Sequence, residues 1–588
     1  ILNDNSPTLV AYTGSYSVID LTLAPPHLAS QLEWFTHSDP KGSDHFPIIV
    51  KSSFQIASSK PTAKFIESRA NWEKYREQIR SEALLRPTTN NINKEVSQIT
   101  RIIKTAANVC IPSSNPIPRS QPAWMNGNIL SRIRDKNRSW KLFQRHPTHQ
   151  NFREYRKQLA IVKMEIKESK RACWANFAKA IDHNLNLSEA WRKVKALPGN
   201  RQASSLANLS VDQRLYTDSQ DIANQLAHSW TAYSSDTTFY NEQIRAKSSW
   251  SFSDKPYSPD PTRNLSHPIS LHELSATLSK CKGSAPGHDR ISYGMIKETP
   301  VSFKERILSL YNNILRNGRF PPAWKIAILI PIRKKNPVNN GQLSPKDLRP
   351  ISLLPCLSRL LEKILSQRLA NMLENILPSQ IHGFRRYRGT TSLLLELEHE
   401  IMDAFSSKRE LHLLSADIEK AYDRVCANVA DHQLQVWGVD ELFIQVIMSF
   451  LSTRTVKVRV NGFLSSRFPI SNALPQGSPF STSLFNTYMT TLTPRLQDID
   501  GLQYYIYADN ILLTTKTDSP TVQLRRAMTA LDIWCYRTGA IIPQNKAELI
   551  SFSRRRNPRL LTLTIGDVEI TAKRQQKILG VTFNSRMN

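Results

Sequence analysis

The 588-residue chain has no apolar run long enough to cross a membrane. The most uniformly apolar run near a predicted strand is IAILIPI at 326–332. This run is far too short to cross a membrane, because a membrane-spanning helix needs roughly 20 apolar residues. Attachment to acidic lipid would require an amphipathic basic helix with a lipid anchor, and we find none. We therefore expect a soluble protein without a membrane partner.

Cysteine is scarce, and the six residues lie far apart, at 110, 173, 281, 356, 426 and 535. They form no CxxC pair and have no group of His nearby, which argues against a zinc site and against a dense disulfide framework. The chain begins at Ile1, without an initiator Met and without a charged segment followed by an apolar one. We therefore expect no secretory signal, a reducing intracellular compartment and a fragment whose beginning is missing.

Acidic residues are outnumbered, because 49 Asp and Glu stand against 78 Lys and Arg, a formal net charge of +29. Such a surplus attracts phosphate polyanions through long-range steering and counterion release. Nucleic acid is therefore the expected partner. At about 100–200 residues per domain, the length suggests three or four units.

Four segments differ in composition and periodicity. Residues 1–52 alternate apolar and polar positions, which predicts strands with one buried face. Residues 53–250 predict a basic helical connecting region. Residues 251–268 are rich in Ser and Pro, which is typical of a linker. Residues 269–588 mix predicted helices and strands, which indicates an α+β domain.

The connecting region contains a basic cluster at 132–171, with thirteen Lys or Arg against four Asp or Glu. Apolar positions spaced 4, 3 and 4 apart predict a helix here: Tyr155, Leu159, Val162 and Ile166. The aromatic residues interleaved with the charges are Trp140, Phe143, Phe152 and Tyr155. This pattern suits a phosphate backbone with exposed bases, and a solvated helix face is the alternative.

Two predicted strands carry carboxylates at their ends. LHLLSAD at 411–417 runs into Asp417, and QYYIYAD at 503–509 reaches Asp509, 92 residues later. If the strands are adjacent, the pair could hold two Mg²⁺ ions, which activate a primer 3′-hydroxyl and stabilise the leaving pyrophosphate. Each Asp alone would be an ordinary turn or cap residue. Asn510 stands where a second carboxylate is expected after Asp509.

The stretch NALPQGSPFSTSLFN at 472–486 contains a Pro-Gln-Gly loop before a predicted helix. Backbone and amide groups of such a loop can lie against a nucleotide and its template base. Further motifs in the same order are SAPGHDRI, FPPAWKIAILIPIRKKN, LRPISLLPCLSRLLEK, SQIHGFRRYRGTT, SADIEKAYDRV, YADN, GAIIPQNKAELISFS and KILGVTF. Together they resemble the reverse transcriptase of non-LTR retrotransposons, and most closely the jockey-like elements of animals. The resemblance covers about residues 266–588.

The resemblance implies roles for individual residues. Asp417 and Asp509 would be the metal ligands, with Asn510 beside them, for Mg²⁺ or alternatively Mn²⁺. The residues expected to contact the incoming nucleotide are Arg349, Lys334 or Lys335, Tyr422, Gln476 and Gly477. Tyr422 would exclude a 2′-hydroxyl, unless it is simply a buried aromatic at a strand end. Lys546 would be the general acid for pyrophosphate, and KILGVTF at 577–583 resembles the hairpin that grips the primer end.

The first 52 residues are similar to the last motifs of the apurinic-type endonuclease that precedes this polymerase in such elements. By this resemblance, His45 would act at the scissile phosphate, oriented by Asp20, with Asp44 beside it. A structural Asp–His pair is the alternative. The metal-binding Glu and the Asp-x-Asn stretch expected upstream are absent from the sequence, so we do not expect this remnant to cut DNA.

The resemblance implies a multidomain protein: an α+β right-hand polymerase of fingers and palm at 269–588, with the thumb missing. A basic helical region would precede it, after a β remnant of an endonuclease/exonuclease/phosphatase-type α/β sandwich. The expected function is RNA-directed DNA synthesis with template RNA, primer or target DNA and dNTPs, in the nucleus and cytoplasm; protein partners stay open. The alternative is a decayed retroelement fragment that only binds nucleic acid.

Departures from the family pattern favour that alternative. Asn510 replaces Asp and removes one negative charge beside two dications, which can cost roughly 10²-fold in rate or more. The other departures are Ala473-Leu474 for Gly-Val, Thr482 for Pro, His382 for Phe, Thr390 for Ser and Asn584 for Asp.

Overall fold

The computed structural model describes the chain apart from residues 12–14, 25, 31, 41–42, 53–63, 115–123, 180–205, 207, 240–259, 335–342, 556–560, 566–567 and 588. It divides into two compact units. Unit 1 contains Ile1–Ala63 and Asn115–Ser205, and unit 2 contains Lys64–Ser114 and Leu206–Asn588. The segment 53–250, treated above as one connecting region, is therefore shared between the two units.

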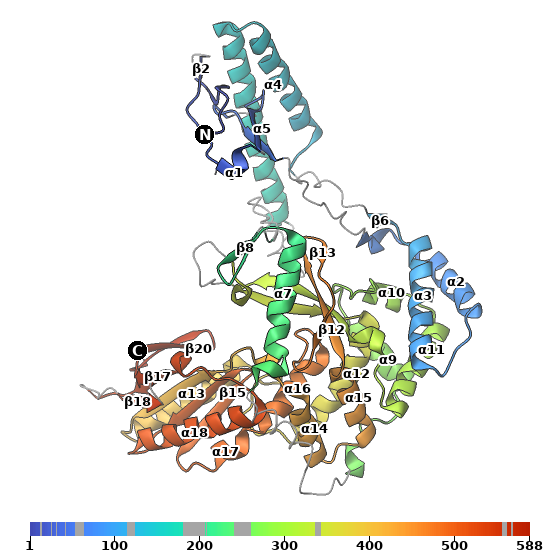
Figure 1. Cartoon of the computed structure of the whole chain (residues 1–588), viewed down its shortest axis with the longest axis vertical. Coiled ribbons are helices and arrows are strands. Elements are labelled where there is room, and N and C mark those ends of the chain that lie inside the picture. Colours follow the sequence, from blue (N-terminus) through green and yellow to red (C-terminus); the bar gives the residue numbers. More distant parts are fainter. Residues whose placement is uncertain are drawn as a thin grey trace. The chain divides into compact units, whose positions relative to one another are not determined.

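Unit 1 contains short strands and a helical hairpin. Its elements are β1 (Leu9–Val10), β2 (Tyr16–Ser17), α1 (Pro26–Ala29), β3 (Leu32–Thr36), β4 (Ile48–Ser52), α4 (Gly127–Arg145) and α5 (His149–Lys179). Strands β3 and β4 pair antiparallel; the alternating pattern of residues 1–52 predicted strands but not their pairing. Helix α4 begins after Asn126, whose side chain accepts a hydrogen bond from the Ile129 amide. Helices α4 and α5 lie side by side (Figure 1).

The aromatic residues of the basic cluster form the core of unit 1. Trp140, Phe143, Phe152 and Tyr155 are all buried, together with Val10 of β1 and Phe46, which lies just before β4. The expectation that these rings are exposed to bases is therefore wrong, because they pack on one another instead. The Lys and Arg side chains of 132–171 are exposed apart from Lys136, which is buried 3.6 Å from Asp39.

Unit 2 begins with two helices that precede the predicted polymerase domain. They are α2 (Trp72–Leu84) and α3 (Ile92–Cys110), and the short strands β5 (Lys64–Phe65) and β6 (Ser113–Ser114) pair beside them. Val96, Ile99 and Ile103 are spaced 3 and 4 apart on α3 and are buried against α10 (Tyr293–Lys297) and α11 (Val301–Asn317). Glu95 on α3 forms a buried ion pair with Arg306 on α11 at 2.6 Å.

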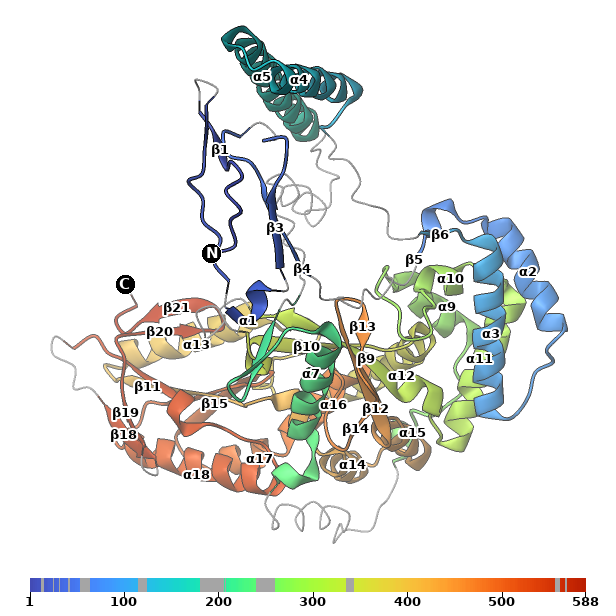
Figure 2. The same ribbon diagram turned by 45° about the horizontal axis from the view of Figure 1, so that its top comes forward.

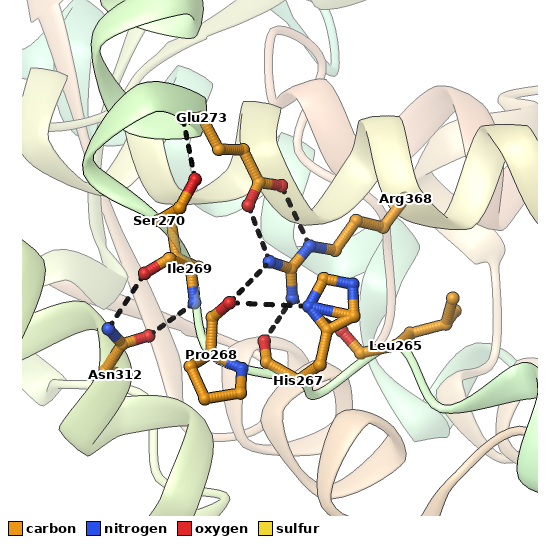
Figure 3. A network of polar contacts seen from close by, with 8 residues as sticks. All are labelled: Leu265, His267, Pro268, Ile269, Ser270, Glu273, Asn312 and Arg368. Carbon is orange, nitrogen blue, oxygen red and sulfur yellow. Dashed lines mark hydrogen bonds and ion pairs between the residues drawn. The ribbon is translucent and has the colours of Figure 1, made fainter.

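The predicted linker ends in an ordered contact. Residues 251–259 lie outside the described residues, whereas residues 265–268 contact α12 (Cys356–Glu374) just before α9 (Leu271–Lys280) begins. Arg368 of α12 donates to the carbonyl oxygens of Leu265 and His267 and pairs with Glu273 at 2.7 Å (Figure 3). Ser270 caps α9 by accepting from the Glu273 amide. These contacts hold the end of the predicted linker against the helices that follow it.

The fingers sheet has the strand order β10-β9-β12-β13, with β14 also paired to β12. Its strands are β9 (Ile326–Arg333), β10 (Leu348–Leu353), β12 (Arg454–Val460), β13 (Phe463–Leu464) and β14 (Phe468–Ile470). The strand predicted from WKIAILIPI is thus confirmed as β9. Helix α7 (Ser219–Ser234) covers this sheet, because Leu226 and Trp230 pack against Val458 (Figure 1). The hairpin β7 (Leu209–Val211) and β8 (Arg214–Tyr216) precedes α7.

The palm sheet has the order β15-β16-β11-β17, and all its pairs are antiparallel. Its strands are β11 (Leu411–Asp417), β15 (Leu502–Tyr507), β16 (Asn510–Thr515) and β17 (Glu548–Phe552). Leu413 packs with α13 (Thr390–Ser406), whereas Leu414 belongs to the core containing α16 (Pro479–Thr490) and α18 (Pro520–Thr538). Figure 2 shows α13 and α18 on opposite sides of the sheet. Both faces of the central strand are therefore buried.

The remaining α-helices and strands among the described residues of unit 2 are α14 (Ala427–Val436), α15 (Glu441–Leu451), α17 (Thr493–Gln497), β18 (Thr562–Ile565), β19 (Val568–Thr571), β20 (Gln575–Ile578) and β21 (Val581–Asn584). Strands β20 and β21 form the hairpin expected at KILGVTF, and its turn places Leu579 and Gly580 at positive φ. Across the described parts of the chain, we find no helix of the length and apolar character that a membrane span requires.

Candidate active site

Asp417 and Asp509 lie on neighbouring elements of the palm. Strand β11 pairs with β16 so that Asp417 stands opposite Asn510. Asp509 lies in the turn between β15 and β16, and its carbonyl oxygen accepts from the Ile418 amide at 3.1 Å. The predicted adjacency of 411–417 and 503–509 is therefore wrong in detail, because β16 lies between β11 and β15. The turn from β15 into β16 nevertheless places Asp509 next to the end of β11.

The turn that carries Asp509 is held by a close backbone contact. Ala508 has a φ of 53°, in the left-handed region. A Cβ atom on Gly383 would lie 2.5 Å from the Ala508 nitrogen, so only glycine fits there. The Gly383 carbonyl oxygen accepts from Asn486 of α16 at 2.9 Å. Gly383 thus packs against the turn at Ala508 and is itself bound to α16.

Burial makes both carboxylates harder to ionise, and the charge of Asp509 adds to this cost at Asp417. The pKa of Asp417 is raised to about 6, first by desolvation and then by the charge of Asp509, against the opposing charges of Lys546 and Lys334. The pKa of Asp509 is also raised by desolvation, and Arg349 opposes the shift. A divalent cation between the carboxylates would remove this repulsion.

Asn510 contributes an amide instead of a charge. Its Nδ2 donates to Asp509 Oδ1 at 3.4 Å. The carboxylate oxygens of Asp417 and Asp509 and the amide oxygen of Asn510 are hard ligands of the kind that Mg²⁺ prefers. The described residues include no cluster of three or more His, Cys, Asp or Glu that could hold a metal ion. The donor set here is therefore a carboxylate pair with one amide.

A strained loop, residues 472–478, leads into α16 and contacts β10; we call it the nucleotide loop after the role that the resemblance predicts for Gln476 and Gly477. Gly477 has a φ of +126°, and a Cβ there would lie 2.7 Å from the Ser352 carbonyl oxygen. The Gln476 carbonyl oxygen accepts from the Ser352 amide at 2.7 Å. Gln476 Nε2 donates to Asp423 Oδ1 at 3.3 Å, and burial raises the pKa of Asp423 to about 6. Sequence reasoning assigned Asp423 no role, although it follows Asp417 by only six residues.

Tyr422 lies between the carboxylates and the nucleotide loop. It belongs to a 3₁₀ turn (Ala421–Arg424) and stacks on Phe485 with ring centroids 5.0 Å apart and an angle of 8°. Burial and the charge of Asp509 raise its pKa. Its carbonyl oxygen accepts from the Leu474 amide at 2.7 Å. The ring is half-buried and is not part of a strand.

The predicted cationic residues differ in their surroundings. Arg349 on β10 and Lys334 after β9 are exposed, and their charges act on the carboxylates as described above. Lys546 Nζ lies 3.9 Å from Glu419 Oε2. Lys335 lies outside the described residues.

In unit 1, the predicted His–Asp pair is formed. His45 Nδ1 lies 2.7 Å from Asp20 Oδ2. The pKa of His45 is raised chiefly by the hydrogen bond to Asp20, and the pKa of Asp20 is lowered by the same bond. Asp44 is exposed beside them and also raises the pKa of His45.

Comparisons with known proteins show which family the domain around these residues belongs to. Residues 332–583 match the family described as reverse transcriptase (RNA-dependent DNA polymerase). The chain therefore contains a reverse transcriptase domain, with the fingers and palm described above.

Three curated relatives show which kind of reverse transcriptase the chain is similar to. The chain is 25% identical over 623 residues to "Probable RNA-directed DNA polymerase from transposon BS" of Drosophila melanogaster, across 100% of the chain and 66% of that protein. It is 26% identical to the "RNA-directed DNA polymerase from mobile element jockey" of the same species, across 69% of the chain and 44% of the relative. A third relative, the "Retrovirus-related Pol polyprotein from type-1 retrotransposable element R2" of Popillia japonica, is 30% identical across 43% of the chain and 35% of its own length.

The chain is thus a homologue of the RNA-directed DNA polymerases of non-LTR retrotransposons, as its motifs predicted. It spans less than two thirds of each of these three relatives.

Proposed function

We propose that unit 2 catalyses RNA-directed DNA synthesis, transferring nucleotides from dNTPs to the 3′-hydroxyl of a primer paired with template RNA. The observation that carries this proposal is the placement of Asp417 and Asp509 on neighbouring palm elements, with Tyr422 between Asp509 and the strained nucleotide loop. Primer or target DNA, template RNA and dNTPs are the substrates and partners that follow.

Asp417 and Asp509 would hold Mg²⁺, or alternatively Mn²⁺, which when bound neutralises charge on the reacting oxygens. The chain's own residues would do the rest. Arg349 and Lys334 would bind the triphosphate, since both are exposed cations whose charges reach the carboxylates. Tyr422, held flat against Phe485, would exclude a 2′-hydroxyl.

Two further assignments belong to this proposal. Gln476 and Gly477 would line the nucleotide pocket, because their loop approaches β10 and Asp423 closely. Lys546 would donate the proton to pyrophosphate. The β20–β21 hairpin would hold the primer end.

Asn510 favours a second candidate, a decayed fragment that only binds nucleic acid. Its amide donates to Asp509 where a carboxylate would add a negative charge. The two candidates separate in a primer-extension assay with an RNA template, a DNA primer and Mg²⁺. We expect weak incorporation by the chain, more by Asn510→Asp, by up to about 10²-fold, and none by Asp417→Ala. Activity that survives Asp417→Ala would overturn the metal-site assignment.

An activity-independent measurement completes the test. If the site binds Mg²⁺, thermal unfolding in Mg²⁺ compared with EDTA should show stabilisation, about 2.7 kcal/mol at 100 times the dissociation constant. Asp417→Ala should remove this shift, and Asn510→Asp should enlarge it. Asn371→Asp, which adds the same charge at an exposed position of α12, is the control and should leave the shift unchanged. Nucleic-acid binding without incorporation by any variant would establish the decayed fragment.

For unit 1, we propose that residues 1–52 are the C-terminal remnant of an apurinic-type endonuclease. The His45–Asp20 contact supports this origin. Asp44 would complete the set carried over from that family.

A further inference from the structure

The nucleotide loop holds two backbone conformations that residues with a Cβ rarely adopt. Ala473 has a φ of 106° and Gly477 a φ of 126°. The first is unfavourable for any residue with a Cβ, so surrounding contacts must maintain it. Two buried charged residues, one near each end of the loop, supply such contacts.

Glu362 of α12 holds the C-terminal end. It is fully buried, and its Oε2 accepts from Ser478 Oγ, while its Oε1 accepts from Ser358 Oγ at 2.6 Å. Ser478 is the N-cap of α16, and the same Oγ accepts from the Phe480 amide at 3.2 Å. The carboxylate therefore sets the rotamer of the residue that joins the loop to its helix.

Arg454 of β12 holds the N-terminal end. Its Nη2 donates to the Ala473 carbonyl oxygen and its Nε to the Leu451 carbonyl oxygen. The Ala473 amide donates to the Val425 carbonyl oxygen at 3.0 Å, so both backbone groups of the strained residue are bound.

The two charges also compensate each other. Burial raises the pKa of Glu362, and Ser358, Ser478, Arg359 and Arg454 oppose that shift. Burial lowers the pKa of Arg454 to about 10, and Glu362 opposes it. A buried charge needs such compensation, because removing one partner leaves the other unpaired in a dry environment.

We propose that Glu362 and Arg454 are positioning residues that hold the nucleotide loop at its two ends, through Ser478 and through the Ala473 carbonyl, in the conformation that receives the incoming nucleotide. The contacts of Glu362 and Arg454 do not depend on the proposed function, whereas their role toward a nucleotide rests on it. Neither side chain would touch the substrate.

Hydrogen exchange tests the contacts without requiring activity. In Glu362→Gln, exchange of peptides covering 472–480 should become about tenfold faster, as expected for loss of a hydrogen bond to a charged group. The double variant Glu362→Gln/Ser478→Ala should exchange no faster than Ser478→Ala alone, because Glu362 acts through Ser478. In Arg454→Met, exchange should rise at the Ala473 end, and Ala473→Gly should partly restore the protection.

Glu400→Gln is the matched control. Glu400 is also a buried carboxylate of unit 2, but it accepts from Tyr505 and Thr514 of the palm sheet. Its variant should leave exchange at 472–480 unchanged. If Glu362→Gln left this exchange unchanged, or raised it no more than elsewhere in unit 2, the proposal would be overturned. If Glu362→Gln does not fold, Ser478→Ala decides by the same criterion.

Kinetics then separates the two proposals. If the chain incorporates nucleotides, Glu362→Gln should raise the KM for dNTP about tenfold and change kcat less than about threefold, since positioning acts on binding. An unchanged KM would overturn the positioning role. If the wild-type chain incorporates nothing, the proposed function fails, while the exchange data still decide whether Glu362 and Arg454 hold the loop.

Discussion

Gly477→Ala tests whether the nucleotide loop has the conformation described here. The new Cβ would lie 2.7 Å from the Ser352 carbonyl oxygen, well inside van der Waals contact. Ser352 cannot withdraw freely, because its amide donates to Gln476 and its strand pairs with β9. The φ of +126° adds a conformational cost that no neighbour can relieve.

Two costs set the expected loss in the free energy of unfolding of Gly477→Ala. Backbone strain at such a φ costs about 1–3 kcal/mol, and overpacking a fixed contact costs about the same. Because the loop will move to share these costs, we expect a loss of about 2–4 kcal/mol in the free energy of unfolding. A domain with about 5–15 kcal/mol of stability survives this loss and stays folded.

The assay is urea unfolding of the variant beside Gly283→Ala, whose Cβ would meet nothing within 4 Å. The control should unfold like the wild type. In the variant, the unfolding midpoint should fall while the slope stays the same, and the dNTP KM should rise if the chain is active. A loss below about 1 kcal/mol would refute the loop conformation, since that is less than the expected strain alone.

Three further predictions concern other parts of the chain. Arg306→Met should destabilise unit 2 by about 3–5 kcal/mol by leaving Glu95 buried and unpaired, and chemical denaturation will measure it; a loss near zero would show that α3 is not part of this core. Replacing the exposed Lys and Arg of 132–171 by Gln should weaken single-stranded RNA binding equally for all sequences. The slope of log binding constant against log salt concentration should become shallower by about 0.7 for each phosphate that the chain no longer neutralises. An unchanged slope would contradict this prediction. In NMR titration, Asp20→Asn should lower the pKa of His45 toward its ordinary value, and an unaltered pKa would exclude their bond. Because that pKa is raised on folding, the pair's stabilisation is full below the unfolded His pKa and is lost as pH rises through the folded one.

The palm strands could be predicted because their pattern and their chemistry agree. LHLLSAD at 411–417 and the two strands around Asp509 are apolar runs that end at polar turns, and the structure pairs them as β11, β15 and β16. The register then follows, since a buried sheet fixes which residues stand opposite each other. This is why the sequence could bring Asp417 and Asp509 together.

The aromatic residues of unit 1 show where the sequence was insufficient. Trp140 and Phe143 are three residues apart, as are Phe152 and Tyr155, and this spacing places each pair on one helix face. A base-stacking surface and a buried core have the same spacing. The stripe from Tyr155 to Ile166 was nevertheless a usable signal, because it placed Tyr155 on the apolar face that is buried in the structure.

The partners of buried charges could not be predicted at all. Glu95 lies 211 residues before Arg306, and Glu362 lies 116 residues before Ser478. In the sequence these residues look like ordinary charges of helical surfaces, because amphipathicity shows which face is buried but not what covers it.

Ala473 shows how a single sequence departure depends on contacts that the sequence does not reveal. In the sequence it is one of several departures from the family pattern, standing where Gly is usual, but its φ of 106° makes it a strained position, since a Cβ is disfavoured where Gly is not. The strain can persist only because Arg454 and Val425 bind both backbone groups of that residue. A chain with Gly at 473 would need Arg454 less, so the departure makes the nucleotide loop more dependent on the buried charges beneath it. The cost of a substitution near a polymerase site thus depends on distant support that its own motif does not contain.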